Sequence, residues 1–212
     1  MSYNDTFIIA KDGFKCIAAA AALMLFFMAV DADLLSFLSS LLLLAAILAF
    51  RNPERTIPHF QEDSIVSVAD GVIKSIETIE DEKGESSYKI VIKSGLLDTS
   101  VLRVPFSCNV SGIEFLYGAR LNTLTPLSDS LNEQCRIFFG KGKKQVRVLH
   151  KLQLSSVGIK NYLSEQNSVV QGMRYGLMVN GKTTLILPVN SRVAVKVGEK
   201  VRAGETLIGF FS

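Results

Sequence analysis

The chain has 212 residues, of which 48% are hydrophobic, and 23 Lys and Arg against 20 Asp and Glu give it a net charge of +3. Together with a mean hydropathy of +0.30, this composition excludes a disordered or collagen-like chain. The three cysteines, Cys16, Cys108 and Cys135, have no CxxC or metal-ligand spacing, which argues against a disulfide framework and a His/Cys metal site and favours a reducing compartment.

The hydrophobic excess lies near the N-terminus, where 31 of the 37 residues from Phe14 to Phe50 are apolar. Two apolar runs, 16–30 and 34–50, are separated by Asp31-Ala32-Asp33 and predict two helices joined by a tight turn. Each run is at or below the roughly 17–25 residues that cross a bilayer, so a spanning hairpin and a re-entrant one both remain open. We expect a tail over 1–13, this hairpin over 14–50 and a separate domain over 51–212.

Basic residues flank both ends of the expected hairpin, and acidic residues lie in its turn. Lys11 and Lys15 precede it, Arg51 and Arg55 follow it, and the remainder from residue 51 carries a net charge of +5. Positively charged flanks remain in the cytoplasm. The sequence therefore predicts a membrane protein whose larger domain lies on the cytoplasmic side.

The domain from residue 51 onward is predicted to be mainly β. Alternating and β-branched residues predict short strands, glycines separate them, and one stretch, 156–164, is compatible with a short helix. The expected strands cover 64–68, 72–76, 88–92, 145–149, 185–187 and 192–197.

Two segments, 68–73 and 195–207, resemble the two halves of the barrel-sandwich hybrid fold of lipoyl and biotinyl carrier domains. The fold class expected is therefore a mainly β, barrel-sandwich-hybrid-like domain preceded by an N-terminal transmembrane or membrane-embedded helical hairpin.

Four collinear motifs resemble the phosphatidylserine decarboxylase family, particularly its short membrane-bound form. They are FRNPERTIP at 50–58, VADG at 68–71, RVP at 103–105 and the segment 195–207. Membership implies a decarboxylase that cuts itself at a Gly-Ser bond and converts the Ser into a pyruvoyl group, which forms a Schiff base with the substrate amine. An Asp and a His assist that Ser in the family.

The resemblance assigns the family Asp to Asp70, which is retained. The His belongs to a pattern like D-V-H-V-N-R-x-P, matched by DTSVLRVP at 98–105, so Ser100 stands at the His position and Leu102 at the Asn position. The retained Asp70 also has a purely structural interpretation, because an Asp-Gly pair between strands is a common turn.

The cleavage pattern, similar to R-x-G-x-I-R-F-G-S, matches RYGLMVNGK at 174–182 and places Lys182 at the Ser. Alignment backward from Pro188 places Gly181 there instead. Neither register contains Gly-Ser, and a lysine has no β-oxygen with which to form the ester. No cofactor is therefore expected, and a pyruvoyl-type group follows only if maturation is atypical, for example by a shifted cut at Thr183 with His59 or His150 assisting from elsewhere.

Three further features have competing interpretations. Arg103 either binds a substrate carboxylate or phosphate or forms a structural ion pair. The basic stretch 140–147 is either a solvated hairpin turn or a contact with anionic headgroups. The segment 176–183 matches G-x-x-x-x-G-K-[ST], but a strand-like sequence follows where a phosphate-binding loop needs a helix, so the match is interpreted as chance.

The first functional hypothesis is a membrane-anchored, decarboxylase-like protein of phospholipid metabolism that has lost the pyruvoyl machinery and binds lipid or regulates a partner. Its expected partner is a membrane phospholipid, with an active paralogue or self-association as further options and no nucleic acid, because no aromatic residues are interleaved with the basic ones. The alternative is an active decarboxylase that makes phosphatidylethanolamine after atypical self-maturation. A third, a structural module at the membrane, remains open, and the sequence leaves open whether the chain is an enzyme.

Overall fold

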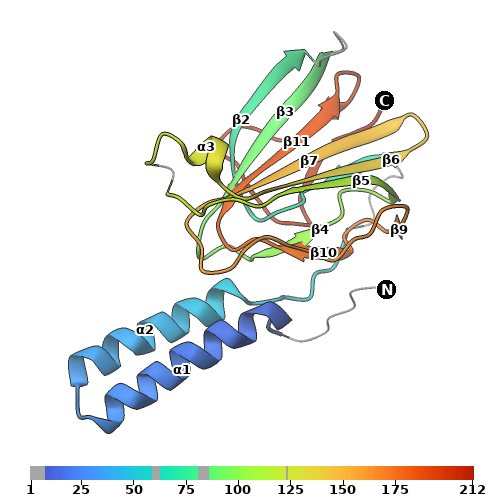
Figure 1. The fold of residues 1–212 in the computed structure, drawn as a ribbon. Coiled ribbons are helices and arrows are strands. Elements are labelled where there is room, and N and C mark those ends of the chain that lie inside the picture. Colours follow the sequence, from blue (N-terminus) through green and yellow to red (C-terminus); the bar gives the residue numbers. More distant parts are fainter. Residues whose placement is uncertain (1–7, 59–62, 81–85, 123) are drawn as a thin grey trace.

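The computed structural model describes residues 8–58, 63–80, 86–122 and 124–212, and it consists of a helical hairpin and a β domain (Figure 1). The hairpin projects from one side of the β domain, and its turn lies at the end farthest from the strands (Figure 1). His59, one of the two histidines considered above, lies outside the described residues.

The hairpin begins with a single 3-10 turn, Lys11–Gly13, which leads into helix α1, Phe14–Ala29, and then helix α2, Asp33–Ala49. Asp31 turns the chain between them with a φ of 52°, the left-handed region that Asp tolerates better than most residues. The predicted pair of apolar helices is therefore confirmed. Within the described residues, one helical stretch, Lys11–Ala29, is long and apolar enough to cross a membrane, whereas α2 is shorter.

Both helices expose large apolar side chains. Phe26 is 60% exposed, Leu34 71% and Phe37 60%. Soluble monomers rarely expose contiguous apolar patches of this kind. The hairpin therefore has the surface of a membrane-associated element.

The β domain is built on a curled, eight-stranded antiparallel sheet (Figure 1). Alternate residues of its strands, such as Ile73, Ile92, Ile137, Val148 and Leu185, form the fully buried core, as the two-residue repeat of a strand requires. In sheet order the strands are β13 (Lys200–Val201), β2 (Gly71–Glu80), β3 (Ser86–Ser94), β11 (Gly181–Pro188), β7 (Lys144–Leu152), β6 (Gln134–Lys141), β5 (Cys108–Leu116) and β9 (Ser168–Val169).

Two three-stranded sheets complete the domain. The first has the order β1 (Ser64–Val66), β14 (Leu207–Phe210) and β12 (Arg192–Val193), and the second has the order β4 (Val101–Arg103), β10 (Arg174–Leu177) and β8 (Lys160–Asn161). Strands β4 and β10 lie between the large sheet and the helical hairpin (Figure 1). The second small sheet is therefore the part of the β domain that faces the hairpin.

The two segments that resemble a barrel-sandwich hybrid lie against each other. Strand β13 pairs with the start of β2, and Ser67 exchanges backbone hydrogen bonds with the other segment, donating to Thr206 O at 2.8 Å and accepting from Gly204 N at 2.7 Å. The predicted fold class, a mainly β domain of this kind behind an apolar hairpin, is confirmed.

Some predicted elements were wrong in detail. Residues 156–164 contain no helix and include the short strand β8, because this segment pairs with β10 instead of closing its own hydrogen bonds. Of 192–197, only the first two residues form a strand. The elements that were not predicted are strands β4, β5, β6, β8, β9, β10, β13 and β14 and the four-residue helix α3 (Ser128–Leu131). Strand β11, not a helix, contains Lys182 and Thr183, which confirms that the phosphate-loop match is chance.

The base of the hairpin packs on the β domain through a small apolar cluster. Ala49 and Phe50 are buried with Val101, Leu177 and Val179, and the Tyr162 hydroxyl donates a hydrogen bond to the Asp12 carboxylate. The segment that matches the expected cleavage pattern, 174–182, is thus in contact with the base of the apolar hairpin.

Candidate functional site

Asp70 lies in the turn between β1 and β2 and is bound on both carboxylate oxygens. Arg55 Nη1 lies 2.6 Å from Oδ1 and Nη2 2.7 Å from Oδ2, and the Ala203 amide also donates to Oδ1 at 2.8 Å. The side chain is 9% exposed. A paired Arg and carboxylate of this geometry forms a strong, directional contact, so Asp70 is committed to structural partners.

The residue after Asp70 must be glycine. Gly71 has a φ of 152°, and a Cβ there would lie 2.3 Å from the Lys93 carbonyl oxygen. The close approach lets β2 begin directly beside β3, and Ser94 Oγ then donates to the Asp70 carbonyl at 2.5 Å. The Asp-Gly pair therefore has a structural role at the start of β2, in addition to matching the family motif.

Ser100, at the family His position, is 1% exposed, and its Oγ has no hydrogen-bond partner within the described part of the chain. The Ser100 carbonyl accepts a hydrogen bond from the Met178 amide at 2.8 Å, and the neighbouring Thr99 Oγ1 lies 3.4 Å from Arg55 Nη2. The structure therefore brings the Asp70 turn, the Ser100 segment and residues near 178 together. A serine hydroxyl at this place cannot act as the base that an imidazole supplies.

Gly181 has no room for a side chain. It pairs with Ser94 of β3 and Leu152 of β7, and a Cβ would lie 2.4 Å from the Lys151 carbonyl oxygen and 2.7 Å from Met178 Sδ. Of the two alignments of the cleavage pattern, the one that places the serine at residue 181 therefore leaves no space for a serine side chain.

Lys182 points away from the core of the domain. Burial alternates along β11 with Gly181 and Thr183 inside, and Lys182 Nζ lies 3.2 Å from Asp129 Oδ1 in a partly exposed ion pair. Lys182 is therefore a surface residue of the strand, and it lacks the hydroxyl that self-cleavage requires.

A buried polar cluster lies on the inner face of β11, and the sequence did not predict it as a unit. Thr183 is opposite His150 in the strand register. His150 Nδ1 lies 2.9 Å from Thr183 Oγ1, and Nε2 lies 2.6 Å from the Tyr175 hydroxyl. All three residues are 1% exposed or less. The signal for it was the polar His150 at an inward position of an alternating strand.

Burial fixes the protonation of this cluster. It lowers the pKa of His150 to about 3 and raises that of Tyr175, so the imidazole and the phenol are both neutral at pH 7. A neutral imidazole donates from one nitrogen and accepts at the other, and both nitrogens are used by Thr183 and Tyr175. No nitrogen of His150 is left for Asp70, so the two do not form the Asp-His pair of the family.

Arg103 is 5% exposed and donates to backbone carbonyls, from Nη1 to Gly172 O at 2.9 Å and from Nη2 to Pro53 O at 3.1 Å. Its pKa is lowered to about 10, first by burial and then by the nearby positive charges of Arg174 and Arg55. These contacts tie β4 to the segment after the hairpin. A role for Arg103 in substrate binding stays a prediction.

Comparison with known proteins decides the family. The model of the family described as phosphatidylserine decarboxylase matches residues 42–209. The chain belongs to the phosphatidylserine decarboxylase family.

Curated relatives with the name phosphatidylserine decarboxylase proenzyme match nearly the whole chain. The protein from Geobacter metallireducens is 30% identical over 97% of this chain and 98% of its own length. That from Paraburkholderia xenovorans is 32% identical, with 95% and 96% covered, and that from Desulfotalea psychrophila is 31% identical, with 95% of each covered. The resemblance seen in the motifs therefore extends over the helical hairpin.

The pyruvoyl group implied by the family does not fit the residues at the matching positions. Gly181 cannot carry a side chain, Lys182 lies on the surface without a β-oxygen, and Ser100 replaces the assisting imidazole. Of the Asp, His, Asn and Ser that the family pattern assigns, only the Asp is retained, as Asp70, and its carboxylate is held by Arg55.

An apolar cleft of about 440 Å³ lies where the hairpin meets the β domain. Small and aliphatic side chains of α1 and α2 form one wall, and Leu96, Leu97 and Val179 belong to the other. Leu96 and Leu97 are 54% and 61% exposed. The cleft is next to the segment that contains Met178 and Gly181, so an apolar ligand here would lie beside the family site.

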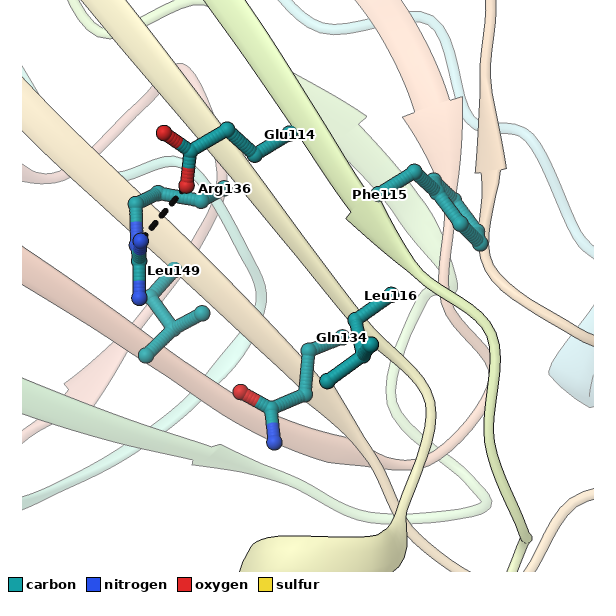
Figure 2. Close-up of a pocket in the computed structure, with 6 residues that line it drawn as sticks. All are labelled: Glu114, Phe115, Leu116, Gln134, Arg136 and Leu149. Carbon is teal, nitrogen blue, oxygen red and sulfur yellow. Dashed lines mark hydrogen bonds and ion pairs between the residues drawn. The ribbon is translucent and has the colours of Figure 1, made fainter.

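A second cleft, of about 290 Å³, lies across β5, β6 and β7 and has no family residue in it. Figure 2 shows the Glu114 and Arg136 side chains turned toward each other over it, with 2.5 Å between Oε2 and Nη1. The ion pair is exposed, and the cleft is set apart from the Asp70 turn.

Proposed function

We propose that this member of the family is a membrane-associated phospholipid-binding protein that does not mature into a decarboxylase. The observation that carries the proposal is the pairing of both Asp70 oxygens with Arg55, beside a Ser100 hydroxyl where the family has a histidine. Retention of the fold and hairpin with loss of the reacting groups favours binding over chemistry.

Binding of phospholipid is supported by the surfaces that remain. The hairpin is apolar on its outside, and the cleft at its base is apolar and open. A lipid bound there would keep its acyl chains against α1 and α2 and its polar end toward the β domain, because apolar surface is removed from water only in that orientation.

The proposal includes an orientation with the β domain on the cytoplasmic side. Lys15 and Arg51 lie at the base of the hairpin, and Asp31 and Asp33 lie at its far turn. Positively charged ends of membrane helices typically lie on the cytoplasmic side, which places the base of the hairpin there. Arg55, counted among the flanking charges in the sequence, contributes little because its guanidinium is buried against Asp70. Protease digestion of right-side-out and inverted vesicles tests the orientation: cleavage of the β domain only in inverted vesicles supports it, and cleavage only in right-side-out vesicles contradicts it.

The function is tested with the full-length chain in neutral detergent micelles. Phosphatidylserine is added, released CO2 is measured, and co-purified lipid is identified by mass spectrometry, with the Geobacter metallireducens relative as the positive control. We expect no CO2 and a bound phospholipid. CO2 release above that of heat-treated protein would contradict the proposal.

The second candidate function is that of an active decarboxylase that matures by an atypical cut before Thr183. It rests on the 2.9 Å contact between His150 and Thr183. In it Thr183 Oγ attacks the Lys182 carbonyl carbon, His150 takes the hydroxyl proton, and the amide becomes an ester. Elimination then releases the 1–182 carboxylate, and hydrolysis of the resulting enamine releases ammonia and leaves a 2-oxobutanoyl group on residue 183. Against this route, Thr183 is fully buried and paired on both sides in the sheet.

A further inference from the structure

Three arginines lie close together on the side of the β domain that faces the hairpin, with two carboxylates among them. Arg103 and Arg174 are directly opposite each other in β4 and β10, and residues so paired extend to the same face of a sheet. Arg55 and Arg174 lower the pKa of Arg103 by charge repulsion. The carboxylates are Asp70 and Glu54.

The two carboxylates are held very differently. Asp70 is buried and bound by Arg55 with two hydrogen bonds. Glu54 has a side chain that is 73% exposed, and one of its oxygens lies 2.7 Å from Arg174 Nη2. Glu54 is therefore a weakly held counter-ion over a guanidinium that is itself only 8% exposed.

The charge of this cluster is not balanced by its own side chains. Among the residues that the structure describes, Arg103 donates to carbonyl oxygens only, so three guanidinium groups face two carboxylates there. Arg174 Nε is buried and has no hydrogen-bond partner within the described residues. Burying an uncompensated charge and an unpaired donor is costly, and a bound anion would relieve both.

The segment that follows α2 passes directly over this cluster. Three consecutive residues contact it: Pro53 O accepts from Arg103, Glu54 binds Arg174, and Arg55 binds Asp70. Strands β4 and β10 face the hairpin (Figure 1). An anion at Arg174 would therefore lie at the base of the membrane-associated helices.

We propose that Arg174, with Arg103 beside it, binds a phosphate group at the base of the hairpin, and that Glu54 occupies this site until the phosphate displaces it. A guanidinium matches a phosphate with two parallel donors, and Arg174 has Nε and Nη2 for this geometry. The inference deepens the proposed lipid binding and rests on it for the source of the phosphate, a phospholipid headgroup as opposed to free phosphate.

The test uses the full-length chain in neutral micelles and isothermal titration calorimetry with three ligands. These are dihexanoyl phosphatidylglycerol, sodium phosphate, and dihexanoylglycerol, which lacks the phosphate. Binding of the first but not the third supports a phosphate site for lipid. Binding of sodium phosphate alone identifies free phosphate as the ligand and overturns the lipid source.

Two substitutions act in opposite directions on the same site. Arg174→Gln removes the guanidinium and should weaken phosphatidylglycerol binding by about tenfold or more, and Glu54→Gln removes the competing carboxylate and should tighten it by about tenfold. The matched controls are Arg202→Gln and Glu205→Gln, which change an exposed Arg-Glu pair and should leave binding within about twofold.

The outcomes separate this inference from the proposed function. If Arg174→Gln and Arg202→Gln change lipid binding equally, the Arg174 site is overturned and the proposed lipid binding stands. If the unaltered chain binds no lipid, both proposals are overturned. If circular dichroism shows that Arg174→Gln is unfolded, Glu54→Gln decides: tighter binding supports the site, and unchanged or weaker binding overturns it.

Discussion

Arg55 and Asp70 join the end of the helical hairpin to the start of the large sheet through two hydrogen bonds of 2.6 and 2.7 Å. Arg55 also donates to the Ala203 carbonyl at 2.7 Å, and the Ala203 amide donates to Asp70. The segments around residues 55, 70 and 203 are therefore held together by one buried ion pair. In this chain the family carboxylate acts as a structural clamp.

Substitution Asp70→Asn should destabilise the β domain strongly. It leaves the Arg55 charge buried without its counter-ion, and breaking a buried pair on one side costs about 3–5 kcal/mol of unfolding free energy. Chemical denaturation of the full-length chain in micelles, followed by circular dichroism, measures the change.

The control for Asp70→Asn is Glu77→Gln, which breaks the exposed Lys89–Glu77 pair. An exposed pair contributes about 0–1 kcal/mol, so this variant should unfold nearly as the unaltered chain does. Equal effects of the two substitutions would show that the Asp70 pair is not a clamp.

The stability of the fold should depend on pH through His150. Its pKa in the folded chain is about 3 against an ordinary value of 6.5, so below pH 6.5 the unfolded chain binds a proton that the folded chain does not. The free energy of unfolding should therefore fall by about 1.4 kcal/mol per pH unit as the pH decreases through this window.

The measurement compares denaturation of the unaltered chain and of His150→Gln between about pH 5 and 6.5, above the range in which most carboxylates titrate. The variant should be less stable at pH 7 but should show a shallower slope. Identical slopes in the two proteins would mean that folding does not lower the pKa of His150.

Substitution Gly181→Ser should not restore self-cleavage and should destabilise the chain. A Cβ would lie 2.4 Å from a backbone carbonyl, and overpacking of this kind costs about 1–3 kcal/mol or more. Thermal unfolding and gel electrophoresis check both parts. A stable protein, or one cut at residue 181, would contradict the account of the strand.

Substitution Lys182→Ser recreates the Gly-Ser pair of the family and should still give a single uncut chain. The new hydroxyl would lie on the outer face of β11, away from His150, and Ser100 offers no base. Only the exposed contact with Asp129 is lost, so stability should change by about 1 kcal/mol or less. The control is Lys182→Ala, and a cut found only with the serine would show that one substitution suffices for maturation.

The fold class was predictable because its signals are local. The apolar runs on either side of Asp31 predict two helices, and alternation predicts the centres of β2, β3, β7 and β11. Strands β5 and β6 contain glycines and charged residues that interrupt alternation, and their pairing with each other depends on tertiary contacts. The segment 156–164 was compatible with a short helix because its pairing with β10 is not visible in its own sequence.

The site was predictable only where it follows the family motifs. Asp70, Ser100 and Gly181 were placed by pattern, and the structure brings their segments together. The partner that Arg55 provides for Asp70, and the cluster of Thr183, His150 and Tyr175, depend on strand register. The contact between the exposed Glu54 and the buried Arg174 has no signal in the sequence. What distinguishes the two side chains is their burial, which residue type alone does not predict.

Whether the chain cuts itself is the central question, and the intact mass of the purified full-length protein answers it most directly. The Geobacter metallireducens relative, purified in parallel, serves as the control for maturation. The account predicts one chain of 23.2 kDa. Two fragments, the smaller beginning at residue 182 or 183 with its N-terminus blocked by a ketoacyl group, would contradict it.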